Sequence, residues 1–146
     1  MIRILTFVVG MPGSGKSTWV KNHMKGTDIV YDLDRIAGAL TMKQEERENL
    51  FARRVAVVSR NEMYETILDL LCETIVPQQV FVIATNPGGW MLDWAIDREL
   101  CVEVIFLKTK FTDRNLPAGV EDGIEENILT FLDKCEGKQI PIYRIV

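Results

Sequence analysis

Short apolar runs alternate along the chain with longer stretches in which apolar residues recur at helical spacing. The first run, Ile2–Val9, is β-branched and apolar except for Arg3 and Thr6, and it predicts a buried strand. Further strands are predicted at Asp28–Leu33, Val80–Ala84, Val102–Leu107 and Ile140–Ile145. Because these runs are apolar on both faces, the sheet they predict is parallel and covered by helices on both sides.

The segments between these runs predict helices. The first helix begins near Lys16 and ends around Gly26. No Gly or Pro occurs from about Lys43 to Ile75, which indicates one long helix or two joined near Ser59–Asn61. Apolar residues recur there every seven positions, at Leu50, Val57, Tyr64 and Leu71. The remaining helices are predicted at Arg35–Leu40, with Asp34 as its N-cap, at Trp90–Leu100 and at Val120–Cys135.

Strand and helix alternate throughout the 146 residues, and no repeat, low-complexity tract or Pro/Gly/Ser-rich linker divides them. The chain therefore predicts a single α/β domain over residues 1–146, with three layers, α/β/α, around a mainly parallel sheet of about five strands. In such folds ligands bind at the carboxyl ends of the strands. We therefore expect the active site at that edge of the sheet.

Charge and composition narrow the setting in which this domain works. Lys and Arg number 17 against 21 Asp and Glu, a net charge of −4, so any polyanion must be held by a local site rather than by the protein as a whole. The longest apolar runs fall far short of the roughly 20 residues that span a bilayer, and Arg3 comes too early for a signal peptide. The widely spaced Cys72, Cys101 and Cys135 suggest neither a disulfide framework nor a zinc site. We expect a cytoplasmic protein without membrane contact, with reduced thiols.

A glycine-rich turn follows the first predicted strand. It reads Gly10-Met11-Pro12-Gly13-Ser14-Gly15-Lys16-Ser17 and matches G-x-x-x-x-G-K-[ST], the P-loop or Walker A pattern, at every defined position. Glycine at three of these positions permits positive φ and removes side chains, so consecutive main-chain N–H groups can converge on phosphate oxygens. The positive end of the following helix favours the same anion. Residues 10–18 are therefore the predicted binding site of a nucleoside triphosphate.

Three side chains of this segment have expected roles in binding ATP and Mg²⁺. Lys16 should reach the β- and γ-phosphates, and the Ser17 hydroxyl should ligate Mg²⁺. Thr18, one position further on, is expected to contact the α-phosphate. The motif and its setting between a strand and a helix predict a P-loop NTPase fold with ATP and Mg²⁺ as its ligands.

The stretch Gly10–Val20, GMPGSGKSTWV, and the later stretch Val30–Ile36, VYDLDRI, together resemble the small P-loop kinases related to the polynucleotide 5′-hydroxyl kinase domain, proteins often described as AAA-type ATPases. The resemblance covers the first quarter of the chain. It implies a parallel five-stranded sheet, ATP with Mg²⁺ as the phosphoryl donor, and an Asp after the second strand that orients and deprotonates an acceptor hydroxyl. It also implies an Arg three residues later that contacts an acceptor phosphate. Carried over to this chain, the D-x-x-R pattern falls on Asp32 and Arg35.

Asp34 is the rival of Asp32 for the role of base. A carboxylate at the end of the second strand would lie across from the γ-phosphate, where it can take the hydroxyl proton. Asp32 or Asp34 could also hold Mg²⁺ through water, beside Ser17. The alternative is that Asp34 only caps the next helix, Asp32 only solvates a strand end, and Arg35 is a solvated helix residue.

The sequence departs from the pattern of these kinases at two places. The family carries an acidic residue at the end of the third strand that positions a Mg²⁺-bound water, and here that place falls on Ala84. Nucleotide-type kinases place several arginines after the fourth strand, where they neutralise charge on the transferred group. The corresponding segment, Lys108–Asp122, contains only Arg114, which is the candidate lid residue unless it is an ordinary exposed loop charge.

The middle of the chain holds further candidates for acceptor binding. Four arginines there could form a basic wall for a phosphorylated acceptor, but interleaved glutamates favour a solvated, salt-bridged helix face. These are Arg47, Arg53, Arg54 and Arg60. Trp90 and Trp94, four residues apart, are expected to pack on the sheet rather than to stack on a base.

The sequence therefore predicts a kinase that transfers the γ-phosphoryl group of ATP to a hydroxyl of a nucleotide, a nucleic-acid end or a small molecule. Its candidate catalytic residues are Lys16, Asp32, Arg35 and Arg114. The alternative is an ATP-binding switch or slow ATPase without an organic acceptor, which Ala84 and the arginine-poor lid favour. The sequence leaves the acceptor and the oligomeric state open.

Overall fold

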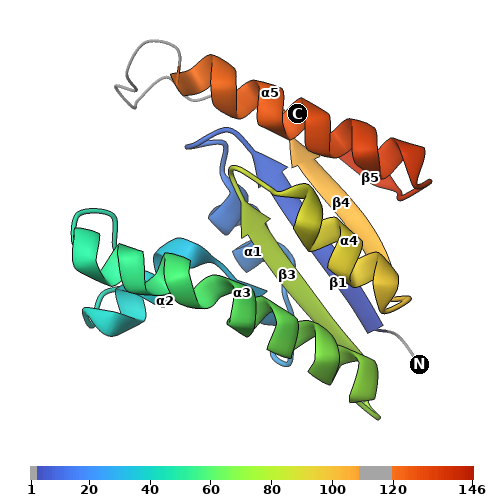
Figure 1. The fold of residues 1–146 in the computed structure, drawn as a ribbon, viewed down its shortest axis with the longest axis horizontal. Helices are drawn as coiled ribbons and strands as arrows, with labels where there is room; N and C mark the ends of the chain where they lie inside the picture. Colours follow the sequence, from blue (N-terminus) through green and yellow to red (C-terminus); the bar gives the residue numbers. More distant parts are fainter. Residues whose placement is uncertain (1–2, 109–119) are drawn as a thin grey trace.

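The computed structural model describes residues 3–108 and 120–146, which form a layered α/β fold (Figure 1). The strands are β1 (Arg3–Gly10), β2 (Ile29–Tyr31), β3 (Gln78–Ala84), β4 (Cys101–Leu107) and β5 (Ile142–Ile145). The helices are α1 (Lys16–His23), α2 (Leu33–Leu40), α3 (Leu50–Glu73), α4 (Gly89–Asp97) and α5 (Val120–Gly137). The strands form one sheet in the order β2-β3-β1-β4-β5, and every neighbouring pair is parallel.

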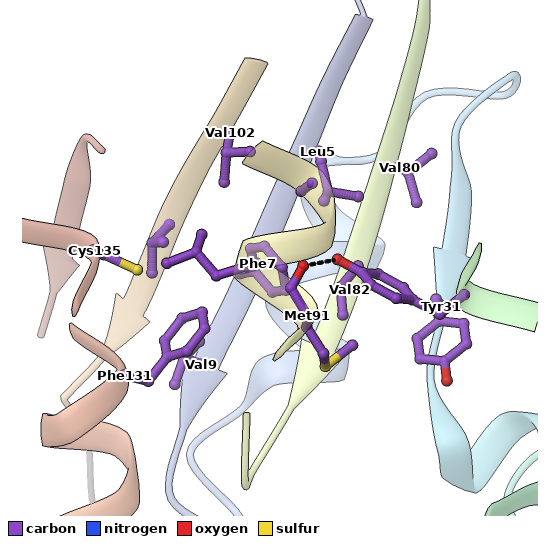
Figure 2. Close-up of a cluster of buried hydrophobic side chains, with 14 of the residues drawn as sticks. Leu5, Phe7, Val9, Tyr31, Val80, Val82, Met91, Val102, Phe131 and Cys135 are labelled. Carbon is purple, nitrogen blue, oxygen red and sulfur yellow. Dashed lines mark hydrogen bonds between the residues drawn. The ribbon is translucent and has the colours of Figure 1, made fainter. Parts of the chain in front are cut away.

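The central strand β1 contributes side chains to the core on both faces of the sheet. Leu5, Phe7 and Val9 belong to a cluster formed with α3, α4 and α5, and Figure 2 shows them among side chains of these layers. Val8 belongs to a second cluster, which includes Val20 of α1. In Figure 1, α4 and α5 lie in front of the sheet and α1 lies behind it. The predicted α/β/α layers around a parallel five-stranded sheet are confirmed.

Helix α3 is fixed to the rest of the fold through Tyr64, which is completely buried. Its hydroxyl donates a hydrogen bond of 2.6 Å to the main-chain oxygen of Met91, at the start of α4 (dashed line in Figure 2). Burial raises the pKa of Tyr64 far above its usual range, so the phenol remains a neutral donor. The hydrogen bond satisfies a polar group that would otherwise be stranded in the core.

The N-cap of α2 is Asp32, not Asp34 as predicted. Asp32 has extended backbone angles, φ −145° and ψ 120°, and its side chain accepts the N–H of Asp34 at 3.1 Å. The prediction was wrong by two residues because β2 ends at Tyr31, earlier than expected, so α2 begins at Leu33. An Asp at this point satisfies an N–H that the helix itself leaves unpaired.

The predicted long middle helix is a single helix, but it begins at Leu50 rather than near Lys43. The polar residues before Leu50 form a loop, because their side chains accept main-chain N–H groups at and just before the start of α3. Asn49 accepts the N–H of Ala52 at 2.9 Å, and Glu46 accepts the N–H groups of Asn49 and Glu48, both at 3.1 Å. These N–H donors, with Asn49 first, lower the pKa of Glu46 to about 2.

This loop packs closely against α2. A Cβ atom at Gly38 would lie 2.7 Å from the main-chain oxygen of Lys43 and 2.8 Å from that of Gln44. The Glu46 N–H also donates to the main-chain oxygen of Asp34 at 3.0 Å. The loop is therefore held between α2 and α3. At position 38 only glycine leaves enough room for it.

Within the described ranges no helix is both long and apolar enough to cross a bilayer. Cys72, Cys101 and Cys135 are all free thiols, and of these only Cys135 is fully buried.

Candidate active site

A cleft of about 600 Å³ lies where β1, β2 and β3 end, at the carboxyl edge predicted for ligands. The glycine-rich turn after β1 forms one part of its wall. The other parts come from the start of α2, the loop before α3, α3 itself and the segment from Ala84 to Met91. Segments far apart in the sequence therefore meet in one cavity that is large enough for a small-molecule ligand.

The backbone of the turn after β1 requires glycine at three positions. Gly13 and Gly15 have φ of 78° and 91°, the left-handed region that other residues rarely adopt. A Cβ at Gly10 would lie 2.5 Å from the Ser14 hydroxyl oxygen, whereas a Cβ at Gly15 would meet nothing within 4 Å. The turn is thus tightly packed beneath Gly10 and open at Gly15.

Helix α1 starts at this turn without a side-chain cap. Its N-cap is Gly15, and the first hydrogen bond of the helical ladder runs from the Trp19 N–H to the Gly15 oxygen at 2.8 Å. The main-chain N–H groups of Ser17 and Thr18 precede that bond, and both residues line the cleft. An uncapped helix N-terminus with its positive dipole end is suited to bind a phosphate group.

Lys16 is buried and lines the cleft. Its Nζ atom donates to the main-chain oxygens of Gly10 and Met11, each at 2.9 Å. The ammonium group is therefore held over the turn. Of the residues predicted to bind ATP, the cleft is lined by Pro12, Gly13, Gly15, Lys16, Ser17 and Thr18. Gly10, Met11 and Ser14 are buried and do not line it.

Asp32 is the buried carboxylate of the cleft, with 7% of its surface exposed. Burial raises its pKa to about 6, and the neighbouring carboxylates of Asp34 and Glu45 act in the same direction. The hydrogen bond from the Asp34 N–H and the charge of Arg35 oppose this rise only in part. Asp32 is therefore ionised at neutral pH yet more basic than an exposed aspartate.

Asp34 has a different environment, because two guanidinium groups engage its carboxylate. Arg53 pairs with one of its oxygens at 2.5 Å and Arg47 with the other at 3.4 Å. Within residues 3–108 and 120–146, no Lys or Arg forms an ion pair with Asp32. Of the two rivals for a base, Asp34 is thus engaged by two guanidinium groups, whereas Asp32 has no such partner among the described residues.

Of the two arginines predicted to be catalytic, the one that the structure describes, Arg35, does not line the cleft. Arg35 is exposed on α2 and acts on Asp32 only through its charge, while Arg114 lies outside the described residues. Three of the four middle arginines line the cleft instead, namely Arg47, Arg53 and Arg60. Arg54 is exposed and points elsewhere on α3.

A periodicity in the sequence could have placed two of these arginines, Arg53 and Arg60, on the buried side of α3. Arg53 and Arg60 are seven residues apart, and the buried Ala56 and Tyr64 follow them by three and four residues, on the same side of α3. The expected salt-bridged helix face is partly correct, because Arg47 and Arg53 form ion pairs. Those ion pairs, however, line the cleft rather than bulk solvent.

Trp90 closes the cleft beside α3. The Arg60 guanidinium lies over its ring at 5.9 Å, and its ring packs edge to face with Tyr64 at 5.5 Å and with Trp94 at 5.0 Å. The expected packing of Trp90 and Trp94 against the core is confirmed. Trp90 also lines the cleft, which sequence spacing alone did not reveal.

The end of β3 brings Ala84, Thr85 and Asn86 to the cleft. Asn86 accepts a hydrogen bond of 2.8 Å from the Asn127 amide of α5. Among the described residues there is no group of three or more His, Cys, Asp or Glu side chains placed to hold a metal ion. A divalent cation in this cleft would therefore depend on the Ser17 hydroxyl, on Asp32 or Asp34 through water, and on the phosphates of a bound nucleotide.

Comparison with known proteins identifies related sequences and folds. The family model described as an AAA domain matches residues 5–87, which is more than half of the chain. No curated protein sequence matches this one. The solved structure of the Pnkp1/Rnl/Hen1 RNA repair complex contains a chain with the same fold, at a TM-score of 0.54 and 14% identity over 93% of this chain. This chain spans less than half of that one, 46%.

Two small kinases show weaker similarity. The shikimate kinase of Acinetobacter baumannii, in complex with shikimate, matches 100% of this chain and 84% of its own, with 15% identity and a TM-score of 0.45. The APS kinase CysC of Mycobacterium tuberculosis matches 91% and 99%, with 16% identity and a TM-score of 0.41.

Proposed function

Since this chain belongs to the family of AAA domains, whose members carry a P-loop, we propose that it is an ATP-dependent phosphotransferase acting on a hydroxyl group. One observation carries the proposal. A single cleft joins the phosphate-binding turn to a buried carboxylate, Asp32, whose raised pKa suits a general base. A protein that only bound nucleotide would need the turn but not this carboxylate.

The donor half of the site is formed by the turn and the first residues of α1. The N–H groups at the start of α1 and the Lys16 ammonium bind the β- and γ-phosphates, and Thr18 lies one position further toward the α-phosphate. The positive φ of Gly13 and Gly15 and the open space at Gly15 fit a loop that wraps around phosphate. Mg²⁺, when bound with ATP, would neutralise charge on the phosphates; Ser17 would hold it, and Asp32 or Asp34 would contact it only through water, which leaves the Asp32 carboxylate free for a proton.

In the transfer step, the acceptor hydroxyl oxygen forms a bond to the γ-phosphorus while the bond between that phosphorus and the β–γ bridging oxygen breaks. The hydroxyl proton passes to the Asp32 carboxylate, and ADP leaves. Asp32 accepts a hydrogen bond from the Asp34 N–H, which fixes the orientation of its side chain. Its pKa of about 6 makes it unprotonated at neutral pH and therefore competent as a base.

The experiment that tests this proposal is transfer of label from γ-labelled ATP to a panel of hydroxyl compounds, including nucleosides, nucleotides, oligonucleotides with a 5′-hydroxyl and polyols. The wild type is compared with Asp32→Asn, which keeps the size of the side chain and its ability to cap α2. We expect label on an acceptor with the wild type only. Label that moves equally well with both proteins would show that Asp32 is not the base.

A second function, slow hydrolysis of ATP without an organic acceptor, is favoured by one residue. Ala84 ends β3 in the cleft where the related kinases carry a carboxylate, so the chain offers less support for a metal-bound water. The same label experiment separates the two functions. Phosphate released to water at equal rates by wild type and Asp32→Asn, with no labelled acceptor, would establish the ATPase and refute the kinase.

A further inference from the structure

The charged side chains of the cleft outside the phosphate-binding turn pair with one another in a way that leaves one group of each sign. Arg53 pairs with Asp34, and Arg47 lies 2.9 Å from Glu45 and 3.4 Å from Asp34. Asp32 and Arg60 also line the cleft, but within the described ranges neither forms an ion pair. The cleft therefore presents one carboxylate and one guanidinium whose charges are not neutralised by a direct partner.

Arg60 is held in place although no carboxylate of the described residues pairs with it. Its guanidinium lies 5.9 Å from the centre of the Trp90 ring, and stacking on an aromatic face leaves the N–H edge of a guanidinium available for hydrogen bonds. Its main-chain oxygen accepts the Tyr31 hydroxyl at 3.0 Å. Because Tyr31 is the residue before Asp32, this bond ties the helix turn that carries Arg60 to the end of β2 that carries the base.

An arginine that is half-buried, oriented by an aromatic ring and unpaired is a binding group for an oxyanion, because a planar guanidinium matches carboxylate and phosphate geometry. Burial of such a cation is unfavourable unless a counter-charge arrives. Arg47 and Arg53 do not have this character, since carboxylates already engage them. Arg35 does not line the cleft at all.

We propose that the acceptor carries an oxyanion, phosphate or carboxylate, in addition to its reactive hydroxyl, and that Arg60 is the residue that selects it. This inference rests on the proposed function, because it takes Asp32 as the point where the hydroxyl binds. Trp90 is a positioning residue in this arrangement, since it orients the guanidinium. The neutral counterpart of the same acceptor lacks the group that binds Arg60 and is therefore discriminated against.

The first test measures binding of inorganic phosphate, and separately acetate, to protein loaded with Mg²⁺ and a non-hydrolysable ATP analogue, so that the phosphate-binding turn is occupied. Titrations are followed by calorimetry for wild type, Arg60→Gln and Arg54→Gln. Arg54 is the matched control, because it lies on the same helix but is exposed and outside the cleft. We expect the dissociation constant of at least one probe to rise about tenfold or more in Arg60→Gln and to stay within about twofold in Arg54→Gln.

The two probes identify which oxyanion the site prefers, and dependence on Arg60 with either one supports the inference. Equal affinity of wild type and Arg60→Gln for both probes, or no binding of either probe to the wild type, would overturn it. If the ATP analogue itself fails to bind, the proposed function is wrong. The comparison of Arg60→Gln with Arg54→Gln on the unloaded protein then still decides whether Arg60 binds an oxyanion.

A second test uses matched acceptors that differ only in charge, such as glycerol with glycerol 3-phosphate and a nucleoside with its 3′-phosphate. Arg60→Gln should lower kcat/KM for the charged member of a pair by about tenfold or more and leave the neutral member unchanged. Arg60→Lys keeps the charge but not the planar stack on Trp90, so an intermediate loss is expected. A wild type that phosphorylates the neutral member as well as the charged one would confirm the kinase and refute the role of Arg60.

Discussion

Replacing Asp32 by Asn is expected to stabilise the protein at neutral pH while it removes the proposed base. Asp32 is almost fully buried in the cleft, where its ionised form has lost the water that an unfolded chain would provide. Asparagine carries no charge to desolvate. Its side-chain oxygen can still accept the Asp34 N–H, so the cap of α2 is retained.

The size of the effect follows from the pKa. Burial, with the charges of Asp34 and Glu45, raises the pKa of Asp32 from 3.8 to about 6, so the folded protein binds this proton more tightly than the unfolded chain. Ionisation of Asp32 therefore opposes folding by an amount that is absent below a pH of about 4, grows between about 4 and 6, and is constant above. At about 1.36 kcal/mol per pKa unit, it reaches about 3 kcal/mol at pH 8.

The assay is urea unfolding followed by circular dichroism, at pH 8 and at pH 4. Asp32→Asn should exceed the wild type in free energy of unfolding by about 2–3 kcal/mol at pH 8 and by less than about 1 kcal/mol at pH 4. Asp133→Asn, an exposed position on α5, is the control and should change stability by less than about 0.5 kcal/mol at either pH. A variant no more stable than the wild type at pH 8, or a gain that does not depend on pH, would refute the idea that Asp32 is a desolvated carboxylate.

Four further predictions concern the donor site, the base, the loop and the core. Lys16→Ala should weaken ATP binding about tenfold or more by calorimetry, and unchanged affinity would argue against the phosphate-binding turn. Transfer activity of the wild type should fall as the pH drops through about 6, because Asp32 becomes protonated; a flat profile between pH 5 and pH 8 would exclude it as the base. Gly38→Ala should lower the free energy of unfolding by about 1–3 kcal/mol, whereas Gly123→Ala, where a Cβ meets nothing within 4 Å, should not lower it. Tyr64→Phe should lower it by about 1–3 kcal/mol because the Met91 oxygen loses its donor, and equal urea midpoints would contradict this.

The donor half of the site could be predicted from the sequence because its geometry is local. Glycine at three spaced positions, followed at once by Lys16 and a helix, determines the backbone of the turn almost without help from the rest of the fold. The strands could be predicted equally well, since continuous apolar runs such as Val80–Ala84 are typical of strands buried on both faces.

The acceptor half could not be predicted in the same way, because it depends on how α3 packs across the sheet. The resemblance assigned the acceptor contact to Arg35, but α2 begins two residues earlier than expected and presents Arg35 to solvent. Arg60 reaches the cleft because Tyr64, one helical turn later, is anchored in the core against Met91. The seven-residue spacing places Arg60 on the same side of α3 as Tyr64, but that contact joins residues 27 positions apart in the chain, so the sequence does not show that this side faces the cleft.

Glu46 has a consequence for the evolution of substrate choice in this protein. Its two sequence neighbours, Glu45 and Arg47, line the cleft, while the Glu46 carboxylate turns inward to the N–H groups of Glu48 and Asn49. Arg53 in addition donates to its main-chain oxygen at 2.7 Å. One inward-facing residue thus sets the position of the rim that Glu45 and Arg47 form. Changes at positions 45 and 47 would therefore act on the part of the cleft around Asp32 and Asp34, while the anchor of the loop at Glu46 is kept.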